Sequence, residues 1–213
     1  MLPPAALELA HVDAHCIVVV KPAGLLAVPG RGEDRQDCLA TRVQARFEDA
    51  LVVHRLDMAT SGLMLFARGA DAQRCLSNAF ARREVHKRYL AVVHSRVARE
   101  QGEIDLPLIA DWPNRPRQKV DPEHGKPSLT RYRVLGFDAA HNITRLALEP
   151  VTGRAHQLRV HLLAIGHPML GDALYAPPAV QALADRLLLH ATSLRFTHPE
   201  SGVAVQVESA VPF

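Results

Sequence analysis

The chain contains few of the features that mark secreted, disulfide-stabilised or membrane proteins. It has three cysteines, Cys16, Cys38 and Cys75, and they form no C-x-x-C pair. This odd and scattered set indicates reduced thiols in a cytoplasmic protein. No apolar run approaches the length of a membrane span, and residues 1–10 lack the basic start and long apolar core of a secretory signal. We therefore expect a cytoplasmic protein with no membrane segment.

Metal-ligand motifs are also missing from the sequence, although it contains 12 histidines. There is no H-E-x-x-H motif, and no group of histidines and cysteines has the spacing of a zinc site. His156 and His161 are five residues apart, so a helix would not place them on one face. We therefore predict no catalytic metal.

A strong excess of one charge sign is absent as well. The formal net charge is +3 and the sequence pI is about 9.0, which suits a nucleic-acid-binding protein but does not require one. Hydrophobic residues make up 48% of the chain and charged residues 22%, as in ordinary soluble globular proteins. A chain of 213 residues can bury a sizeable core as one domain or form two small ones.

Helical periodicity is confined to a few segments. Asp37 is a candidate N-cap for a short helix in which Leu39, Val43 and Phe47 recur at intervals of four. Residues 72–80 have the three-then-four spacing of an amphipathic helix. Two further helices are predicted from Thr152-Gly153 to Gly166 and after Pro177-Pro178.

Strand-like segments dominate the rest of the sequence, and neighbouring ones are spaced as in hairpins. They occupy residues 17–20, 52–53, 63–66, 89–93, 129–134, 143–148, 187–196 and 203–207. This pattern predicts a mixed α/β (α+β) fold, with a mainly antiparallel sheet and interspersed helices in one domain over residues 1–213.

Residues 111–126 form a proline-rich, irregular segment that we interpret as a loop or a long hairpin. Its basic side chains could contact phosphates, with Trp112 as a packing or stacking anchor. The alternative is a solvated basic loop around a buried tryptophan. The basic residues concerned are Arg115, Arg117, Lys119 and Lys126.

The most informative segment runs from Val53 to Leu63 and reads VHRLDMATSGL. It places Asp57 in a polar turn between two apolar strands, where a carboxylate is rigidly aimed. Such an aspartate could serve catalysis, or it could only cap the turn by accepting bonds from backbone N–H groups.

This segment, His-Arg-Leu-Asp followed by Thr-Ser-Gly-Leu, resembles the catalytic motif of the RluA family of pseudouridine synthases. A second segment, GRAHQLRVH at residues 153–161, resembles the family's later motif, and Gly166-His167-Pro168 and Gly171-Asp172 continue the match. The resemblance runs from about Val12 to the C-terminus. It implies the pseudouridine synthase fold, a bent mainly antiparallel sheet with flanking helices and a central catalytic cleft. It also leads us to expect no N-terminal S4-like RNA-binding domain.

The resemblance implies that Asp57 is the essential aspartate and that Arg159 is its partner. On a helix, Arg159 shares a face with Ala155, Leu162 and Leu163, and a guanidinium among apolar side chains is rarely left unpaired. Pairing would keep Asp57 ionised and oriented. Alternatively, Arg159 extends to solvent or pairs with another acid.

Two further roles rest on the resemblance. Tyr89, in Lys87-Arg88-Tyr89, matches the family's Lys-x-Tyr motif, so its ring could stack on an extruded uracil and its hydroxyl could help take the C5 proton. Without the resemblance, Tyr89 would be a half-buried strand tyrosine. Arg55, two residues before Asp57, would fill the stack that the flipped base leaves, or contact a phosphate. We assign no step to His54.

The resemblance therefore implies an isomerase that converts uridine to pseudouridine in RNA without metal or cofactor. It further implies dual specificity, for a tRNA anticodon stem-loop at uridine 32 and a 23S rRNA hairpin at uridine 746. The alternatives are the same chemistry at another rRNA or tRNA site, a non-catalytic RNA-binding factor, and a nucleoside hydrolase that would release free uracil. A monomer suits such an enzyme.

Overall fold

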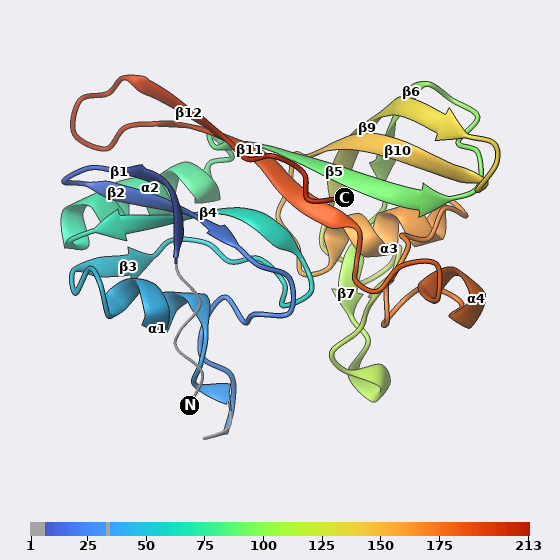
Figure 1. Cartoon of the computed structure of the whole chain (residues 1–213), viewed down its shortest axis with the longest axis horizontal. Coiled ribbons are helices and arrows are strands. Elements are labelled where there is room, and N and C mark those ends of the chain that lie inside the picture. The colour runs from blue at the N-terminus through green and yellow to red at the C-terminus, as the bar shows by residue number, and fades with distance from the viewer. Residues whose placement is uncertain (1–6, 33–34) are drawn as a thin grey trace. The chain divides into compact units, whose positions relative to one another are not determined.

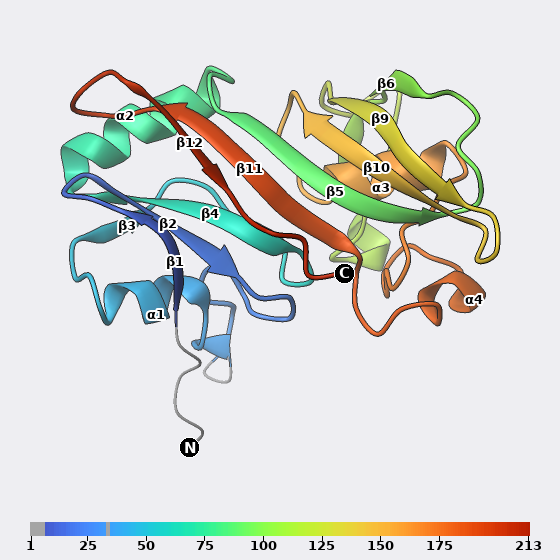
Figure 2. The same cartoon turned by 45° about the horizontal axis from the view of Figure 1, so that its top comes forward.

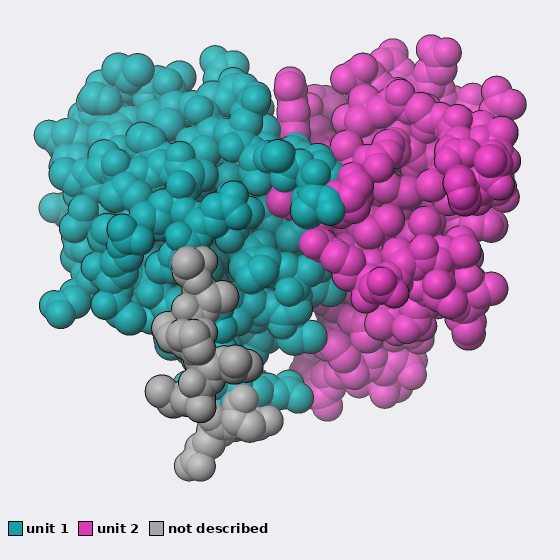
Figure 3. All heavy atoms as spheres, in the orientation of Figure 1, with its two compact units in different colours: residues 1–87, 191–212 teal, residues 88–190, 213 magenta. Residues whose placement is uncertain are grey.

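The computed structural model describes residues 7–32 and 35–213, and the chain divides into two compact units (Figure 3). Unit 1 contains residues 1–87 and 191–212, and unit 2 contains residues 88–190 and 213. The prediction of a single domain stays a prediction. In the part of the chain that the structure describes, each helix is too short or too polar to cross a lipid bilayer.

Unit 1 contains strands in the order β1-β2-β4-β11-β12, with β3 beside β4 (Figure 1). The pairs β1–β2, β2–β4, β3–β4 and β11–β12 are antiparallel. Val18 of β2 lies opposite Leu65 of β4 in this register. The strands are β1 (Glu8–Val12), β2 (Cys16–Lys21), β3 (Ala50–Val52), β4 (Ser61–Arg68), β11 (Leu189–Thr197) and β12 (Ala204–Glu208), and the helices are α1 (Leu39–Gln44) and α2 (Ala70–Ala81).

The core of unit 1 explains why β2 and β4 read as continuous apolar runs. Alternate residues of these strands, such as Val18 and Leu65, pack against Ala72 and Leu76 of α2 in one buried cluster. Their neighbours in sequence, Phe66 among them, are buried as well. Strands that are covered on both faces lose the apolar–polar alternation of a surface strand. In α2, apolar residues spaced by three and then four positions lie on one face of the helix, and this face packs against the strands.

Unit 2 contains the antiparallel strands β5-β10-β9-β6 (Figure 2). Strands β7 and β8 form a separate antiparallel hairpin. Helix α3 lies against β8, β9 and β10. The elements are β5 (His86–His94), β6 (Gln101–Asp105), β7 (Leu108–Ala110), β8 (Gln118–Val120), β9 (Leu129–Asp138), β10 (Ile143–Pro150), α3 (Gln157–Ala164), α4 (Pro178–Gln181) and a short 3-10 helix at Trp112–Asn114.

Helix α3 is buried from Gln157 to Leu162, including its polar side chains. Gln157 donates to the Leu129 carbonyl and to the Thr130 hydroxyl, both at 3.0 Å. His161 contacts the Thr130 hydroxyl at 2.9 Å and the Leu106 carbonyl at 3.0 Å. Buried polar groups need such partners, so α3 is fixed against β9 by hydrogen bonds as well as by apolar packing.

These elements confirm the predicted mixed α/β fold with mainly antiparallel strands. One detail of the prediction was wrong: the N-cap of α1 is Cys38, whose sulfur accepts from the Thr41 N–H, and not Asp37. The Asp37 carboxylate instead accepts two hydrogen bonds from Arg42, five residues further along the chain. Phe47 lies beyond the end of this helix. The hairpin interpretation of residues 111–126 is confirmed by the pairing of β7 with β8.

Candidate active site

Asp57 lies in the loop that joins β3 to β4, as the strand–turn–strand pattern predicted. The loop folds back on itself, because the Thr60 N–H donates to the Asp57 carbonyl at 3.1 Å. Leu56 and Thr60 are buried on either side of the aspartate, and the aspartate itself is half-buried. Anchored neighbours of this kind hold a carboxylate in one direction, which catalysis requires.

Lys21, at the end of β2, fixes the same loop. Its side chain is fully buried, and its ammonium donates to the carbonyls of Pro22 at 2.8 Å, Leu25 at 2.7 Å and Met58 at 3.0 Å. The Met58 carbonyl also accepts from the Gly24 N–H at 2.9 Å. The residue after Asp57 is thus bonded to the turn that follows β2. Sequence reasoning took Lys21-Pro22-Ala23-Gly24 only as a turn and missed this role.

His54 lies in the same loop, between β3 and β4, and bonds this loop to β4. Its Nε2 accepts a hydrogen bond from the Leu65 N–H at 2.9 Å, and its ring stacks on Phe80 with centroids 4.4 Å apart. Burial and the nearby charge of Lys87 lower the pKa of His54 to about 3. The ring is therefore neutral at physiological pH, with its proton on Nδ1. This structural role agrees with assigning His54 no step in the reaction.

Gly62, the second residue of β4, could not be replaced without movement of its neighbours. Its φ of +112° is one that residues with a Cβ rarely adopt, and a Cβ there would overlap the backbone of Ala191 on β11. The glycine that follows Ser61 is thus explained by a close approach of two backbones. Arg55, two residues before Asp57, is exposed and available to a ligand.

In unit 2, Arg159 is buried on α3, with 4% of its side chain exposed. Its guanidinium binds Asp172 with two hydrogen bonds, from Nε at 2.8 Å and from Nη2 at 2.6 Å. Sequence reasoning did not identify Asp172 as this partner, although Gly171-Asp172 had been noted within the matched motif. The pairing of Arg159 with Asp57 stays a prediction.

Tyr175 covers the face of this ion pair. The Arg159 guanidinium carbon lies 4.9 Å from the centre of the Tyr175 ring, a cation–π distance. The Tyr175 hydroxyl accepts from the Gln118 N–H at 2.8 Å and contacts Nδ1 of His156 at 2.6 Å. His156 itself has the left-handed φ of 54° and forms the N-cap position of α3. The network therefore links the start of α3 to the β7–β8 hairpin.

Tyr89 lies on β5 opposite Leu148 of β10 and is half-buried. A strand tyrosine in this setting is held by its neighbours on the sheet. Its contact with substrate stays a prediction.

The basic hairpin segment presents an exposed aromatic side chain, contrary to the alternative of a buried tryptophan. Trp112 has 64% of its surface exposed, and the Arg115 guanidinium lies 4.3 Å from its ring centre. Arg117 donates to the Leu174 carbonyl, so its guanidinium is occupied within unit 2. Lys119 forms an exposed ion pair with Asp121 at 3.5 Å. An exposed ring with a stacked guanidinium is well suited to nucleic acid bases.

The sequence of this chain matches the model of a protein family described as RNA pseudouridylate synthase over residues 15–164. The match covers more than half of the chain and includes both Asp57 and Arg159. The chain therefore belongs to the RNA pseudouridylate synthase family. It is a pseudouridine synthase, an isomerase that acts on RNA.

Named relatives extend this result to almost the full length. The chain is 50% identical over 207 residues to the dual-specificity RNA pseudouridine synthase RluA of Escherichia coli K12, covering 97% of this chain and 94% of that protein. It is 51% identical over 203 residues to the RluA of Yersinia pestis, covering 95% and 98%.

Two solved structures share the fold. Human RNA Pseudouridylate Synthase Domain Containing 1 matches with a TM-score of 0.82 at 29% identity, covering 100% of this chain and 87% of that one. Human RNA Pseudouridylate Synthase Domain Containing 4 matches with a TM-score of 0.78 at 23% identity, covering 96% and 88%. The second likeness concerns the fold alone.

Proposed function

We propose that this enzyme isomerises uridines in two RNAs, a tRNA anticodon stem-loop at uridine 32 and a 23S rRNA hairpin at uridine 746. The observation that carries the proposal is 50% identity over 97% of the chain to a relative named for dual specificity. Hairpin loops offer the splayed bases and compact shape that a small enzyme can recognise.

The reaction breaks the bond from N1 of uracil to the sugar and forms a new bond to the sugar from C5, from which a proton is lost. The atoms of the RNA are conserved, so the reaction needs no oxidant, metal or organic cofactor. Asp57 is the proposed catalytic carboxylate. Three actions are compatible with it: attack on the sugar, attack on the base, and promotion of proton loss from the sugar.

Arg159 and Tyr89 complete the proposed catalytic set. Arg159 would hold the carboxylate of Asp57 ionised, as a cation beside an acid does. Its bidentate bond to Asp172 supports this proposal, because a guanidinium fixed along one edge presents its remaining N–H groups in a defined direction. Tyr89 would stack on the flipped uracil and help to remove the C5 proton.

The proposed RNA contacts are Arg55, Arg115, Arg117 and Lys119. Arg55 would occupy the space left by the flipped base. Trp112 would stack on an unpaired base, and Arg115, whose guanidinium lies over the exposed Trp112 ring, would contact a phosphate. Arg117 and Lys119 would lie near phosphates, with Arg117 also holding the hairpin to Leu174. We propose further that the enzyme acts as a monomer in the cytoplasm.

The test is tritium release from C5-labelled uridine in two RNAs, the tRNA anticodon stem-loop and the 23S hairpin. Wild-type enzyme should release tritium from both, and Asp57→Asn from neither, while RNA affinity stays near wild type. A matched control is Asp71→Asn, which changes an aspartate with 96% of its side chain exposed and should keep full activity.

Each other outcome identifies a different error. Release from one RNA alone would contradict dual specificity. Full activity of Asp57→Asn would remove Asp57 from the mechanism. A loss of uracil mass from the RNA would indicate hydrolysis, because isomerisation leaves the RNA mass unchanged.

A further inference from the structure

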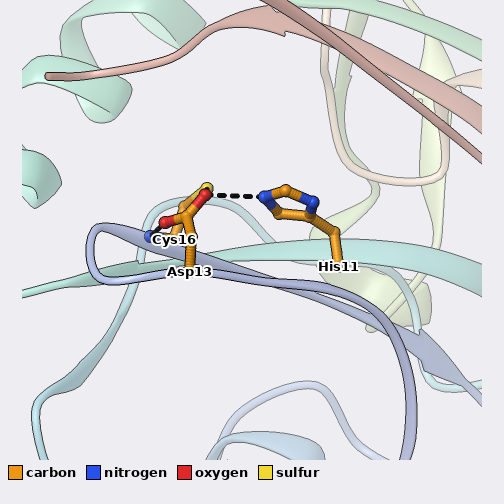
Figure 4. A group of neighbouring side chains, drawn as sticks. All are labelled: His11, Asp13 and Cys16. Carbon is orange, nitrogen blue, oxygen red and sulfur yellow. Dashed lines mark hydrogen bonds and ion pairs between the residues drawn. The ribbon is translucent and has the colours of Figure 1, made fainter. Parts of the chain in front are cut away.

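The turn between β1 and β2 brings three chemically different ligand atoms together (Figure 4). Nε2 of His11, a carboxylate oxygen of Asp13 and Sγ of Cys16 lie within 4.8 Å of one another. His11 Nε2 is 2.6 Å from Asp13 Oδ2, and Cys16 Sγ is 3.4 Å from the same oxygen. In the part of the chain that the structure describes, this is the group of His, Cys, Asp and Glu side chains whose spacing would suit a metal ion.

The backbone of the turn fixes the orientation of the Asp13 carboxylate. Its Oδ1 accepts from the N–H groups of His15 at 2.7 Å and Cys16 at 2.8 Å. Its Oδ2 is turned toward His11 and Cys16. One oxygen of the carboxylate is therefore bonded to the backbone, and the other faces the side chains of His11 and Cys16. Figure 4 shows the His11 ring and the Asp13 carboxylate pointing toward one another, with the sulfur of Cys16 beside the carboxylate.

We propose that His11, Asp13 and Cys16 bind one zinc ion. Imidazole nitrogen, carboxylate oxygen and thiolate sulfur are the three ligand types that zinc takes from proteins. The carboxylate and a thiolate together carry two negative charges, which match a divalent cation. On binding, the ion takes the place of the thiol proton of Cys16, which passes to solvent, and neutral His11 binds through Nε2 with its own proton on Nδ1.

The burial of the three residues is consistent with a site that has one side open. Cys16 is fully buried, whereas about a third of the His11 and Asp13 side chains is exposed, at 32% and 29%. A water molecule can therefore complete a tetrahedral arrangement from the solvent side. Cys16 is a free cysteine, so its sulfur is not committed to a disulfide.

We infer that His198 orients the Asp13 carboxylate and is not a fourth ligand of the ion. Its Nε2 lies 3.2 Å from Asp13 Oδ2, but its Nδ1 accepts from the N–H groups of Glu200 at 3.3 Å and Ser201 at 3.1 Å. With Nδ1 used as an acceptor, the proton of neutral His198 is on Nε2, where it donates to Asp13. Such a donor orients the carboxylate that binds the metal.

The site joins β1 to β2 at the point where the chain reverses. Arg68 of β4 donates to the Asp13 carbonyl at 3.0 Å, so the turn is also bonded to β4. A bound ion would stabilise the folded form over the unfolded form by mass action. The role we infer is structural, and it is independent of the proposed reaction at Asp57.

The first test titrates the full-length, chelator-treated protein with Co²⁺ as a spectroscopic probe and with Zn²⁺ in competition. We expect one equivalent to bind, a thiolate-to-Co²⁺ charge-transfer band in the near ultraviolet, and displacement by Zn²⁺. Wild-type melting temperature should rise with Zn²⁺ concentration. His11→Gln should weaken binding at least about tenfold, and Cys16→Ala should remove the thiolate band.

Two control variants separate this site from unrelated binding. Cys75→Ala removes an exposed thiol elsewhere on the chain and should leave the spectrum unchanged. His141→Gln removes a histidine that contacts Asp138 at 2.7 Å, nearly the His11–Asp13 distance, and should also leave it unchanged.

Three results would overturn the proposal. One is the absence of saturable binding, which would make the group a hydrogen-bonded turn only. The second is binding that survives His11→Gln with unchanged affinity. The third is a thiolate band that is lost in Cys75→Ala instead of Cys16→Ala. Because His11 is partly exposed, His11→Gln gives a result even if Cys16→Ala fails to fold.

Discussion

The Lys21 ammonium donates a hydrogen bond to the Met58 carbonyl at 3.0 Å, and thereby attaches the end of β2 to the residue that follows Asp57. A buried lysine with three carbonyl partners is stable only when all of them stay in place. The position of the Asp57 loop therefore depends on a residue 37 positions away in sequence.

Replacing Lys21 should disturb both stability and catalysis. Lys21→Met keeps much of the side-chain volume but removes the ammonium that donates to three carbonyls, so we expect a loss of roughly 1–3 kcal/mol in the free energy of unfolding. We also expect kcat to fall more than RNA affinity, because the carboxylate would be less well positioned. Urea unfolding and single-turnover tritium release measure the two effects. Arg74→Met, at a site where 72% of the side chain is exposed, is the control. Unchanged stability and kcat in Lys21→Met would contradict the anchoring role.

The second prediction concerns the contribution of the buried Arg159–Asp172 ion pair to stability. Asp172→Asn removes the negative charge that bonds the buried Arg159 guanidinium twice, so unfolding should become easier by up to about 5 kcal/mol. The exposed pair of Arg131 and Glu103 is the control, since Glu103→Gln should change stability by less than about 1 kcal/mol. Equal effects from the two variants, measured by denaturant unfolding, would show that burial does not matter here.

The lowered pKa of His54 predicts that the folded protein loses stability as the pH falls. Its folded-state pKa is about 3, below the ordinary value of 6.5, because it is buried near the charge of Lys87. Between these values the unfolded chain binds the extra proton, so stability is complete above about pH 6.5 and falls as pH drops toward 3. The contribution of one such group is at most about 1.4 kcal/mol per pH unit.

The variant His54→Gln should show a smaller loss of stability on acidification than wild type. At pH 8 it should itself be less stable by roughly 0.5–3 kcal/mol, because the ring that stacks on Phe80 is lost. Burial also lowers the pKa of His190, to about 4, so the acid slope will be reduced but not abolished. Urea unfolding at pH 8, 6 and 5 measures the difference. The exposed His124→Gln should follow the wild-type profile, and a His54→Gln profile parallel to wild type would refute the prediction.

The exposed pair of Trp112 and Arg115 should affect RNA binding without affecting the fold. Trp112→Ala should weaken RNA binding by about 1–3 kcal/mol, the usual contribution of a ring that stacks on a base. Arg115→Ala should reduce the salt dependence of binding by about one phosphate contact. Neither should change the unfolding midpoint, because Trp112 is largely exposed. Filter binding at several salt concentrations measures both effects, and a stability loss in Trp112→Ala would indicate a packing role instead.

The sequence predicted the features of this protein that depend on local periodicity. Strand β4 and helix α2 were expected from their apolar spacing, and the loop around Asp57 from the polar break between strands. Partner choices across long separations could not be predicted in this way. The pairing of Arg159 with Asp172 and of Lys21 with Met58 depends on how distant segments pack, which no local pattern encodes.

A similar limit applies at short range when two partners compete. Asp37 and Cys38 are both able to cap α1, and Asp37 is the better capping residue by its chemistry. Arg42 decides the outcome, because it takes both carboxylate oxygens of Asp37 and leaves the sulfur of Cys38 to accept from Thr41. Propensity alone therefore located the helix but misidentified its cap.

Gly62 allows backbone strain and steric overlap to be separated. Gly62→Ala should cost well over the roughly 1–2 kcal/mol of a residue forced into positive φ, because its Cβ would also overlap the Ala191 backbone. Gly69→Ala, at φ +77° with open space around it, should show the strain alone. Gly136→Ala, with open space and no positive φ, should change little. Denaturant unfolding should rank the three in this order. If Gly62→Ala costs no more than Gly69→Ala, then β4 and β11 can separate locally, and the start of β4 is not the rigid support of the Asp57 loop that the structure indicates.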